Sequence, residues 1–259
     1  MDTALFKLKR FNLIMGFFHL IQGVAMLFLA TTVIQKIAAF QPTIIQFYLK
    51  FNPATKSLEP ASNELFQLPF GILVASFLLI SAIAHVIIVL CSKTYLNDIQ
   101  KGINKFRWFE YALSSSIMIV LIATLFGIYD IASLVVIFLA NAGMNLFGLD
   151  MEQLNSGAEK ENVKWGPFIW GSIVGLAPWI AILLYMFGNG NFDMVPWFVW
   201  AIVGTYFVAF CTFPINMILQ YKRVGKWNNY IYGERTYIVL SLVAKSLLAW
   251  LVLFGAMQP

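Results

Sequence analysis

The chain has few charged residues, few histidines and few cysteines. Charged side chains make up 11% of its 259 residues, against about 25% in an ordinary soluble domain, so there is too little polar surface to cover a water-exposed globule. The two cysteines, Cys91 and Cys211, fall inside or at the edge of apolar stretches, which argues against a disulfide framework and favours a packing role. Apolar residues make up 60% of the chain, and lipid is therefore its expected solvent.

Seven apolar stretches are long enough to cross a bilayer, which takes about 20 residues. They are expected at about 11–31, 68–91, 106–127, 129–149, 167–187, 195–220 and 236–256. The first is too long for the apolar core of a cleaved signal peptide, so it is expected to remain as a span. No internal repeat is visible, and the chain is interpreted as one all-α, seven-helix transmembrane domain over residues 1–259. Seven crossings place the two termini on opposite sides.

The basic residues are unevenly divided between the two sides of the predicted bundle. Of the 17, thirteen lie in the N-terminal segment and in the joints on its side, three lie on the opposite side, and Lys245 lies within a span. Cytoplasmic loops are enriched in Lys and Arg, so the N-terminus is predicted to be cytoplasmic and the C-terminus extracellular. Because these residues are scattered over the loops, the net charge of +5 indicates topology and not nucleic-acid binding.

The one long joint, residues 32–67, is predicted to lie outside. From Ile45 to Lys50 apolar residues alternate with more polar ones, and Asn52 and Pro53 follow, a pattern typical of a strand and a turn. Two interpretations remain open: a small β-hairpin that covers the bundle, and a disordered loop.

A lysine in the middle of a spanning helix costs about 2.5–3.5 kcal/mol on insertion scales. Lys245 lies about 14 Å past the predicted start of the last span. It is either an amine that forms a Schiff base or relays protons, or a structural cation paired with a carboxylate. The candidate partner is Glu110 in the third span. Ser114 lies on the same helix face as Glu110 and Ser241 on the same face as Lys245, and both hydroxyls are expected to form hydrogen bonds with the charged groups. The alternative is an interfacial Glu110 held in water by Arg107.

The two histidines, His19 and His85, both lie in predicted spans, about 9–12 Å below the cytoplasmic face. Two imidazoles in one layer can hold a proton or a water cluster. With Gln22 and Arg107 they are predicted to form a proton-accepting polar cavity; the alternative is that they are packing residues. No third ligand of that kind is evident, so no metal site is predicted.

Trp108, Tyr111, Trp179 and Trp250 are candidates for the walls of a flat apolar slot, because they lie within spans close to these polar residues. The amide of Asn141 in the fourth span is expected to bond neighbouring helices.

Four motifs resemble the heliorhodopsin family, and the resemblance covers almost the whole chain. They are the runs FRWFEYALSSS at 106–116, GERTYIVLSLVAKS at 233–246, FHLIQ at 18–22 and KWNNY at 226–230. Seven helices with a lysine in the middle of the last is the arrangement of retinal proteins in general. The resemblance implies a rhodopsin-type bundle with a cytoplasmic N-terminus, inverted relative to other microbial rhodopsins, which agrees with the basic residues.

The resemblance implies a retinal photoreceptor and not an enzyme. Lys245 would hold all-trans retinal covalently as a protonated Schiff base, Glu110 would be the counterion, and Ser241 would bond near that linkage. His19 and His85 would form the internal polar cavity. Asn141, Met144 and Trp250 would contact the chromophore. A homodimer and a cytoplasmic signalling partner are also implied.

Under this interpretation, light isomerises the retinal and the proton of the linkage moves to the layer of Glu110, His19 and His85. The signal is then a rearranged cytoplasmic half, without net ion transport. Two other classes remain open. One is a light-driven ion transporter or channel, which would share every pocket residue; the other is a non-retinal membrane transporter or enzyme that uses Lys245 directly.

Overall fold

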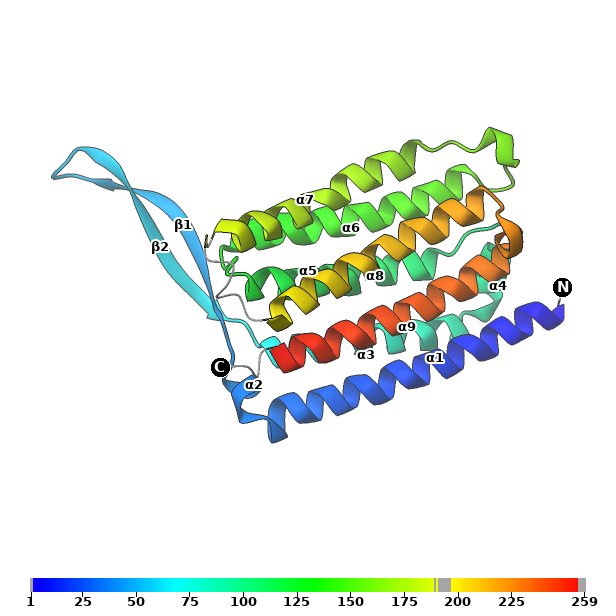
Figure 1. Cartoon of the computed structure of the whole chain (residues 1–259), viewed down its shortest axis with the longest axis horizontal. Helices are drawn as coiled ribbons and strands as arrows, with labels where there is room; N and C mark the ends of the chain where they lie inside the picture. The colour runs from blue at the N-terminus through cyan, green and yellow to red at the C-terminus, as the bar shows by residue number, and fades with distance from the viewer. Residues whose placement is uncertain (1, 189, 191–196, 256–259) are drawn as a thin grey trace.

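The computed structural model describes residues 2–188, 190 and 197–255, and seven of the helices in these residues are long and apolar enough to cross a membrane. They are α1 (Asp2–Phe28), α3 (Phe70–Leu90), α5 (Lys105–Leu125), α6 (Ile131–Leu154), α7 (Gly166–Gly188), α8 (Trp197–Tyr221) and α9 (Tyr230–Gly255). The helices lie side by side, and α1 begins at the opposite end of the bundle from the end of α9 (Figure 1). The predicted fold class, a seven-helix membrane bundle, is confirmed.

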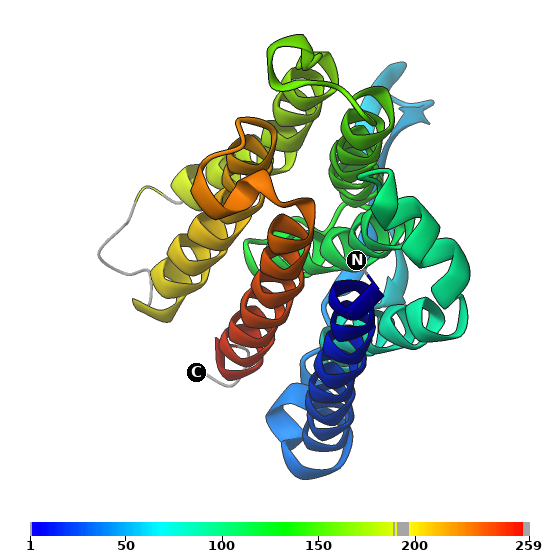
Figure 2. The same ribbon diagram turned by 90° about the vertical axis from the view of Figure 1, so that its right-hand side faces the viewer.

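Each spanning helix packs on one or more of the others. α1 packs on α3 and α9, α5 packs on α3 and α6, α6 packs on α7, and α8 packs on α9. Seen from the end where α1 begins, α9 lies between α1 and α8 (Figure 2). Large apolar side chains such as Phe17, Leu139 and Leu184 are 59%, 61% and 68% exposed on the outer faces. Lipid therefore covers faces that would be unstable in water.

At the end of the bundle where α1 begins, here called the N-terminal end, three helices extend beyond the predicted spans. α1 begins at Asp2 and not near 11, α6 continues to Leu154 and not 149, and α9 begins at Tyr230 and not 236. Glu152 and Glu234, which fall outside the predicted spans, are each 1% exposed and lie within these helices. The predicted limits at 195 and 256 lie outside the described residues.

The joint after α1 forms a β-hairpin. Strands β1 (Thr43–Asn52) and β2 (Ser57–Gln67) pair antiparallel, and the Asn52 side chain accepts a hydrogen bond of 2.9 Å from the Ala54 N–H in the turn. The strand-and-turn interpretation is confirmed, but the expectation that the hairpin covers the bundle is wrong. Ile44 at its base is fully buried, whereas Phe47 farther along is 62% exposed, and the hairpin projects away from the helices (Figure 1). Its end of the bundle is called the hairpin end below.

Short helical segments connect the larger elements. They are η1 (Leu29–Val33), α2 (Gln35–Ala39), α4 (Ser92–Gln100), η2 (Lys160–Asn162) and η4 (Gly225–Asn228). α4 was not expected from the sequence; its Tyr95 is fully buried against Leu8 and Ile88. Asn104 then starts α5, because its side chain accepts a hydrogen bond of 3.0 Å from the Arg107 N–H.

Candidate functional site

Lys245 and Glu110 form a buried ion pair between α9 and α5. Their side chains are 4% and 7% exposed. The Ser81 hydroxyl of α3 bridges the pair: it accepts a hydrogen bond from Lys245 Nζ at 2.6 Å and donates one to Glu110 Oε1 at 2.6 Å. Tyr111 lies beside the ammonium, with its ring centre 5.2 Å from Nζ. A cation and an anion removed from water are thus balanced and hydrogen-bonded, as burial requires.

The sequence missed Ser81 and assigned the hydrogen bonding of the pair to Ser114 and Ser241. Ser241 is buried on α9, but the hydroxyl that bridges the two charges comes from α3. Ser114, also buried, lies one turn beyond Glu110 on α5. Ser81 precedes His85 by four residues and therefore shares its helix face, a signal that would have pointed to it.

The two histidines lie together, as expected from their similar depth in the predicted spans. The rings of His19 and His85 stack with their centres 5.6 Å apart. His85 Nδ1 shares a hydrogen bond of 2.9 Å with Asn12 Oδ1. Both ring nitrogens of His19 are buried and have no hydrogen-bond partner among the described residues. A buried imidazole of this kind has an open lone pair that can accept a proton.

The other two residues predicted for this polar cavity lie elsewhere. The Gln22 side chain donates to the Phe18 carbonyl of its own helix at 3.5 Å. Arg107 forms ion pairs with Glu152 and Glu234, not with the histidines or Glu110. Its place in the predicted cavity is therefore corrected: the pairing with two carboxylates holds it at the N-terminal ends of α5 and α9.

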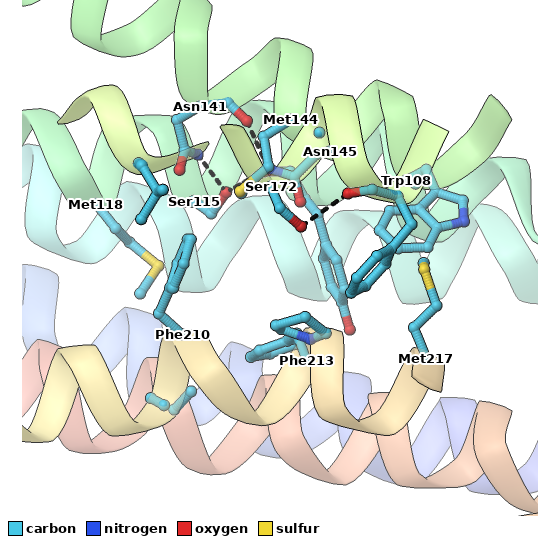
Figure 3. Close-up of a pocket in the computed structure, with 18 of the residues that line it drawn as sticks. Trp108, Ser115, Met118, Asn141, Met144, Asn145, Ser172, Phe210, Phe213 and Met217 are labelled. Carbon is cyan, nitrogen blue, oxygen red and sulfur yellow. Dashed lines mark hydrogen bonds between the residues drawn. The ribbon is translucent and has the colours of Figure 1, made fainter. Parts of the chain in front are cut away.

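A cavity of about 280 Å³ lies between α5, α6, α7 and α8, and Lys245 contributes to its wall. Figure 3 shows Phe210, Phe213 and Met217 on its α8 side. The lining is mainly apolar and aromatic, and its volume is close to the lower end of the range of about 300–1,000 Å³ for ligand pockets. An amine at the wall of an apolar slot suits a long, flat, apolar ligand.

Close approach of helices shapes one wall of this cavity. A Cβ at Gly171 would lie 2.9 Å from Phe147 Cβ, and Cβ atoms at Gly148 and Gly175 would overlap the Trp108 ring and the Met144 side chain. Only glycine leaves these two side chains where they now flank the cavity. The residues present therefore fit a chromophore such as retinal.

Among the predicted slot residues, the structure separates two groups. Trp108, Tyr111, Asn141 and Met144 line the cavity. Trp179 and Trp250 do not: Trp179 stacks on the lining residue Tyr206 with ring centres 5.0 Å apart, and Trp250 stacks on Phe254 farther along α9. Asn141 donates to Ser115 and Ser116 of α5 at 2.7 and 3.0 Å, so it joins helices as expected of an amide.

The chain was compared with protein-family models and with curated proteins. No curated protein matches it. The family model described as Heliorhodopsin matches residues 8–257, which is nearly the whole chain. The chain therefore belongs to the heliorhodopsin family, whose members are seven-helix membrane photoreceptors with a retinal chromophore.

Proposed function

We propose that Lys245 holds all-trans retinal as a protonated Schiff base with Glu110 as its counterion, and that the protein senses light by an internal proton transfer without net ion transport. The observation that carries the proposal is the position of Lys245, which is 4% exposed, paired with Glu110 and part of the wall of the apolar cavity. Retinal, when bound, supplies absorption of visible light and isomerisation.

Each residue of the site has a task that follows from its contacts. Glu110 balances the positive charge at Lys245, and Ser81 fixes the relative positions of the two groups. The cavity wall excludes water, so the electrostatic attraction within the pair is strong. A disturbance of this pair would leave the proton at Lys245 Nζ in need of an acceptor.

The nearest acceptors are Glu110 within the pair and the histidines on its N-terminal side. His85 lies within the electrostatic range of both Glu110 and Lys245. His85 Nδ1 is engaged by Asn12, which leaves Nε2 open, and His19 stacks beside it. A proton transferred there changes the charge and packing at this end of the bundle, which is the kind of change that a sensor reports.

The test is a visible spectrum of the purified protein after addition of all-trans retinal. A visible band is expected in the unmodified protein and in the control Lys93→Ala, whose side chain belongs to the short helix α4. Lys245→Ala is expected to lose the band and remain folded, because only a primary amine at that position can form the imine. A band that survives in Lys245→Ala with retinal still covalently attached would show that the assignment is wrong.

The homodimer, the cytoplasmic partner and the cytoplasmic N-terminus stay predictions of the sequence.

A further inference from the structure

A second group of buried charges lies at the N-terminal ends of α5, α6 and α9. Arg107 forms ion pairs with both Glu152 and Glu234, and the three side chains are 4%, 2% and 1% exposed. We call these three residues with Asn104 and Trp108 the Arg107 cluster. It is separate from the Lys245–Glu110 pair, and nothing in the proposed photochemistry uses it directly.

The Arg107 cluster contains one cation and two carboxylates. If both carboxylates were ionised, one negative charge would remain uncompensated in a site that water does not reach, at a cost of several kcal/mol. Among the described residues, the charged and titratable groups facing Glu234 are Arg107, Glu152 and the tyrosines Tyr95, Tyr111, Tyr230 and Tyr237. Arg107 is the single cation among them. One proton shared with the carboxylates would restore neutrality.

The hydrogen bonds decide which carboxylate takes that proton. Besides Arg107, Glu152 accepts from the Asn104 N–H at 2.8 Å, from Trp108 Nε1 at 2.7 Å and from the Tyr230 hydroxyl at 3.2 Å. Glu234 accepts a 2.6 Å bond from Asn104 Nδ2 in addition to its bond from Arg107, and the Tyr95 hydroxyl also faces it, so it has one donor fewer than Glu152. More donors favour the ionised form, so the proton is assigned to Glu234, the carboxyl group with fewer donors.

A chain of side chains connects this cluster to the histidine layer. Asn12 Nδ2 donates to the Leu8 carbonyl at 3.0 Å and to the Tyr95 hydroxyl at 3.2 Å. Both amide hydrogens are thus used, and Asn12 Oδ1 is an acceptor, so His85 Nδ1 must donate to it. Burial raises the pKa of Tyr95 well above its usual value. Tyr95 therefore remains a neutral hydroxyl, whose own hydrogen is available to Glu234.

We propose that the Arg107 cluster is a second proton-holding site, with the proton on Glu234. Through the Tyr95–Asn12–His85 chain, the strength of the hydrogen bond from Tyr95 to Glu234 responds to the charge at Lys245 and Glu110. The first half stands on the geometry of the cluster alone; the second half rests on the proposed function. An amide conducts no proton, so the coupling is a change in hydrogen-bond strength. A charge placed on His85 polarises Asn12, which alters how strongly Tyr95 donates to Glu234.

The first experiment is infrared spectroscopy of the protein without added retinal, in the carbonyl-stretch region of protonated carboxylic acids. A band that shifts in deuterium oxide is expected, and Glu234→Gln should remove it. The exposed control Glu161→Gln should leave it unchanged. Absence of such a band, or its persistence in Glu234→Gln and loss in Glu152→Gln, would overturn the assignment of the proton to Glu234.

The second experiment is light-minus-dark infrared spectroscopy of the pigment. The Glu234 band is expected to shift on illumination, and Tyr95→Phe should abolish this light-induced shift while the band itself remains in the dark. If the Glu234 band does not shift on illumination of a functioning pigment, the proposed coupling is wrong. Failure to form any pigment would count against the proposed function instead, and the dark spectrum would still decide the proton site.

Discussion

Replacement of Ser81 by alanine is expected to move the acid titration of the visible band to higher pH. The Ser81 hydroxyl donates to Glu110 Oε1 at 2.6 Å and accepts from Lys245 Nζ at 2.6 Å. Its bond to the carboxylate stabilises the ionised counterion and is lost when Glu110 is neutral. Without the hydroxyl, Glu110 therefore takes up a proton at a higher pH, and the band shifts to the red there.

The size of this effect follows from the contacts. A hydrogen bond to a charged group contributes about 1.5–3 kcal/mol, and about 1.4 kcal/mol corresponds to one pH unit. The loss of one such bond to Glu110 therefore raises the midpoint by about one to two units. Ser81 is 1% exposed, so water has little access to replace the missing donor and the full effect is expected.

The assay is the position of the visible band measured as the pH is lowered. Ser241→Ala is the matched control, because Ser241 is also a buried serine, on the helix of Lys245, and does not bridge the pair. Its midpoint should stay within a few tenths of a unit of the parent. If Ser81→Ala leaves the midpoint unchanged and Ser241→Ala moves it, the bridging serine has been misidentified and the argument from the ion pair fails.

Three further results are expected. Glu110→Gln should shift the band strongly to the red or release the proton from Lys245 near neutral pH; an unchanged spectrum from roughly pH 5 to 9 would mean that another group is the counterion. A tag before Met1 should be protected in intact cells while a tag after Pro259 is labelled from outside, because cytoplasmic loops are rich in Lys and Arg, and surface labelling of the N-terminal tag alone would reverse the orientation. Illumination of whole cells should give no steady photocurrent, and a steady current that Lys245→Ala abolishes would favour a transporter.

The sequence predicted most of the bundle because lipid imposes a simple rule on composition. A span needs about 20 apolar residues, and seven such stretches are visible without any knowledge of packing. Lys245 was also easy to find, since a single cation in a long apolar run has a cost that requires an explanation. The hairpin was a weaker prediction, because strand alternation indicates its pairing but says nothing of its direction away from the bundle.

The Arg107 cluster was not predicted because its members lie far apart along the chain and meet only in the folded bundle. Glu152 and Glu234 lie 45 and 127 residues from Arg107 along the chain. Both lie just outside the spans predicted from apolar runs, so nothing in their own neighbours places them inside the bundle. Only the packing of three helices shows that these charges satisfy one another inside the bundle. The bridging role of Ser81 was missed because the two charges that it joins lie on other helices, α5 and α9.

The expectation of no current rests on the distribution of ionisable groups along the bundle. Beyond Lys245 toward the hairpin end, α9 contributes Leu248, Ala249 and Val252 to a core in which each is at most 2% exposed. Besides Glu110 and Lys245 themselves, the buried acidic, histidine and arginine side chains of the described part lie level with Lys245 or toward the N-terminal end; they are His19, His85, Asp98, Arg107, Glu152 and Glu234.

Asp130, near the hairpin end, is already engaged in local structure. Burial tends to raise the pKa of Asp130. Hydrogen bonds from the Ser133 N–H and hydroxyl nevertheless hold this pKa below its usual value. It stays an ionised helix cap for α6 and does not accept and release a proton near neutral pH. A proton that leaves Lys245 thus has acceptors on one side and an apolar core on the other. Transport needs a relay on both sides, and this arrangement favours return of the proton to Lys245 over its release.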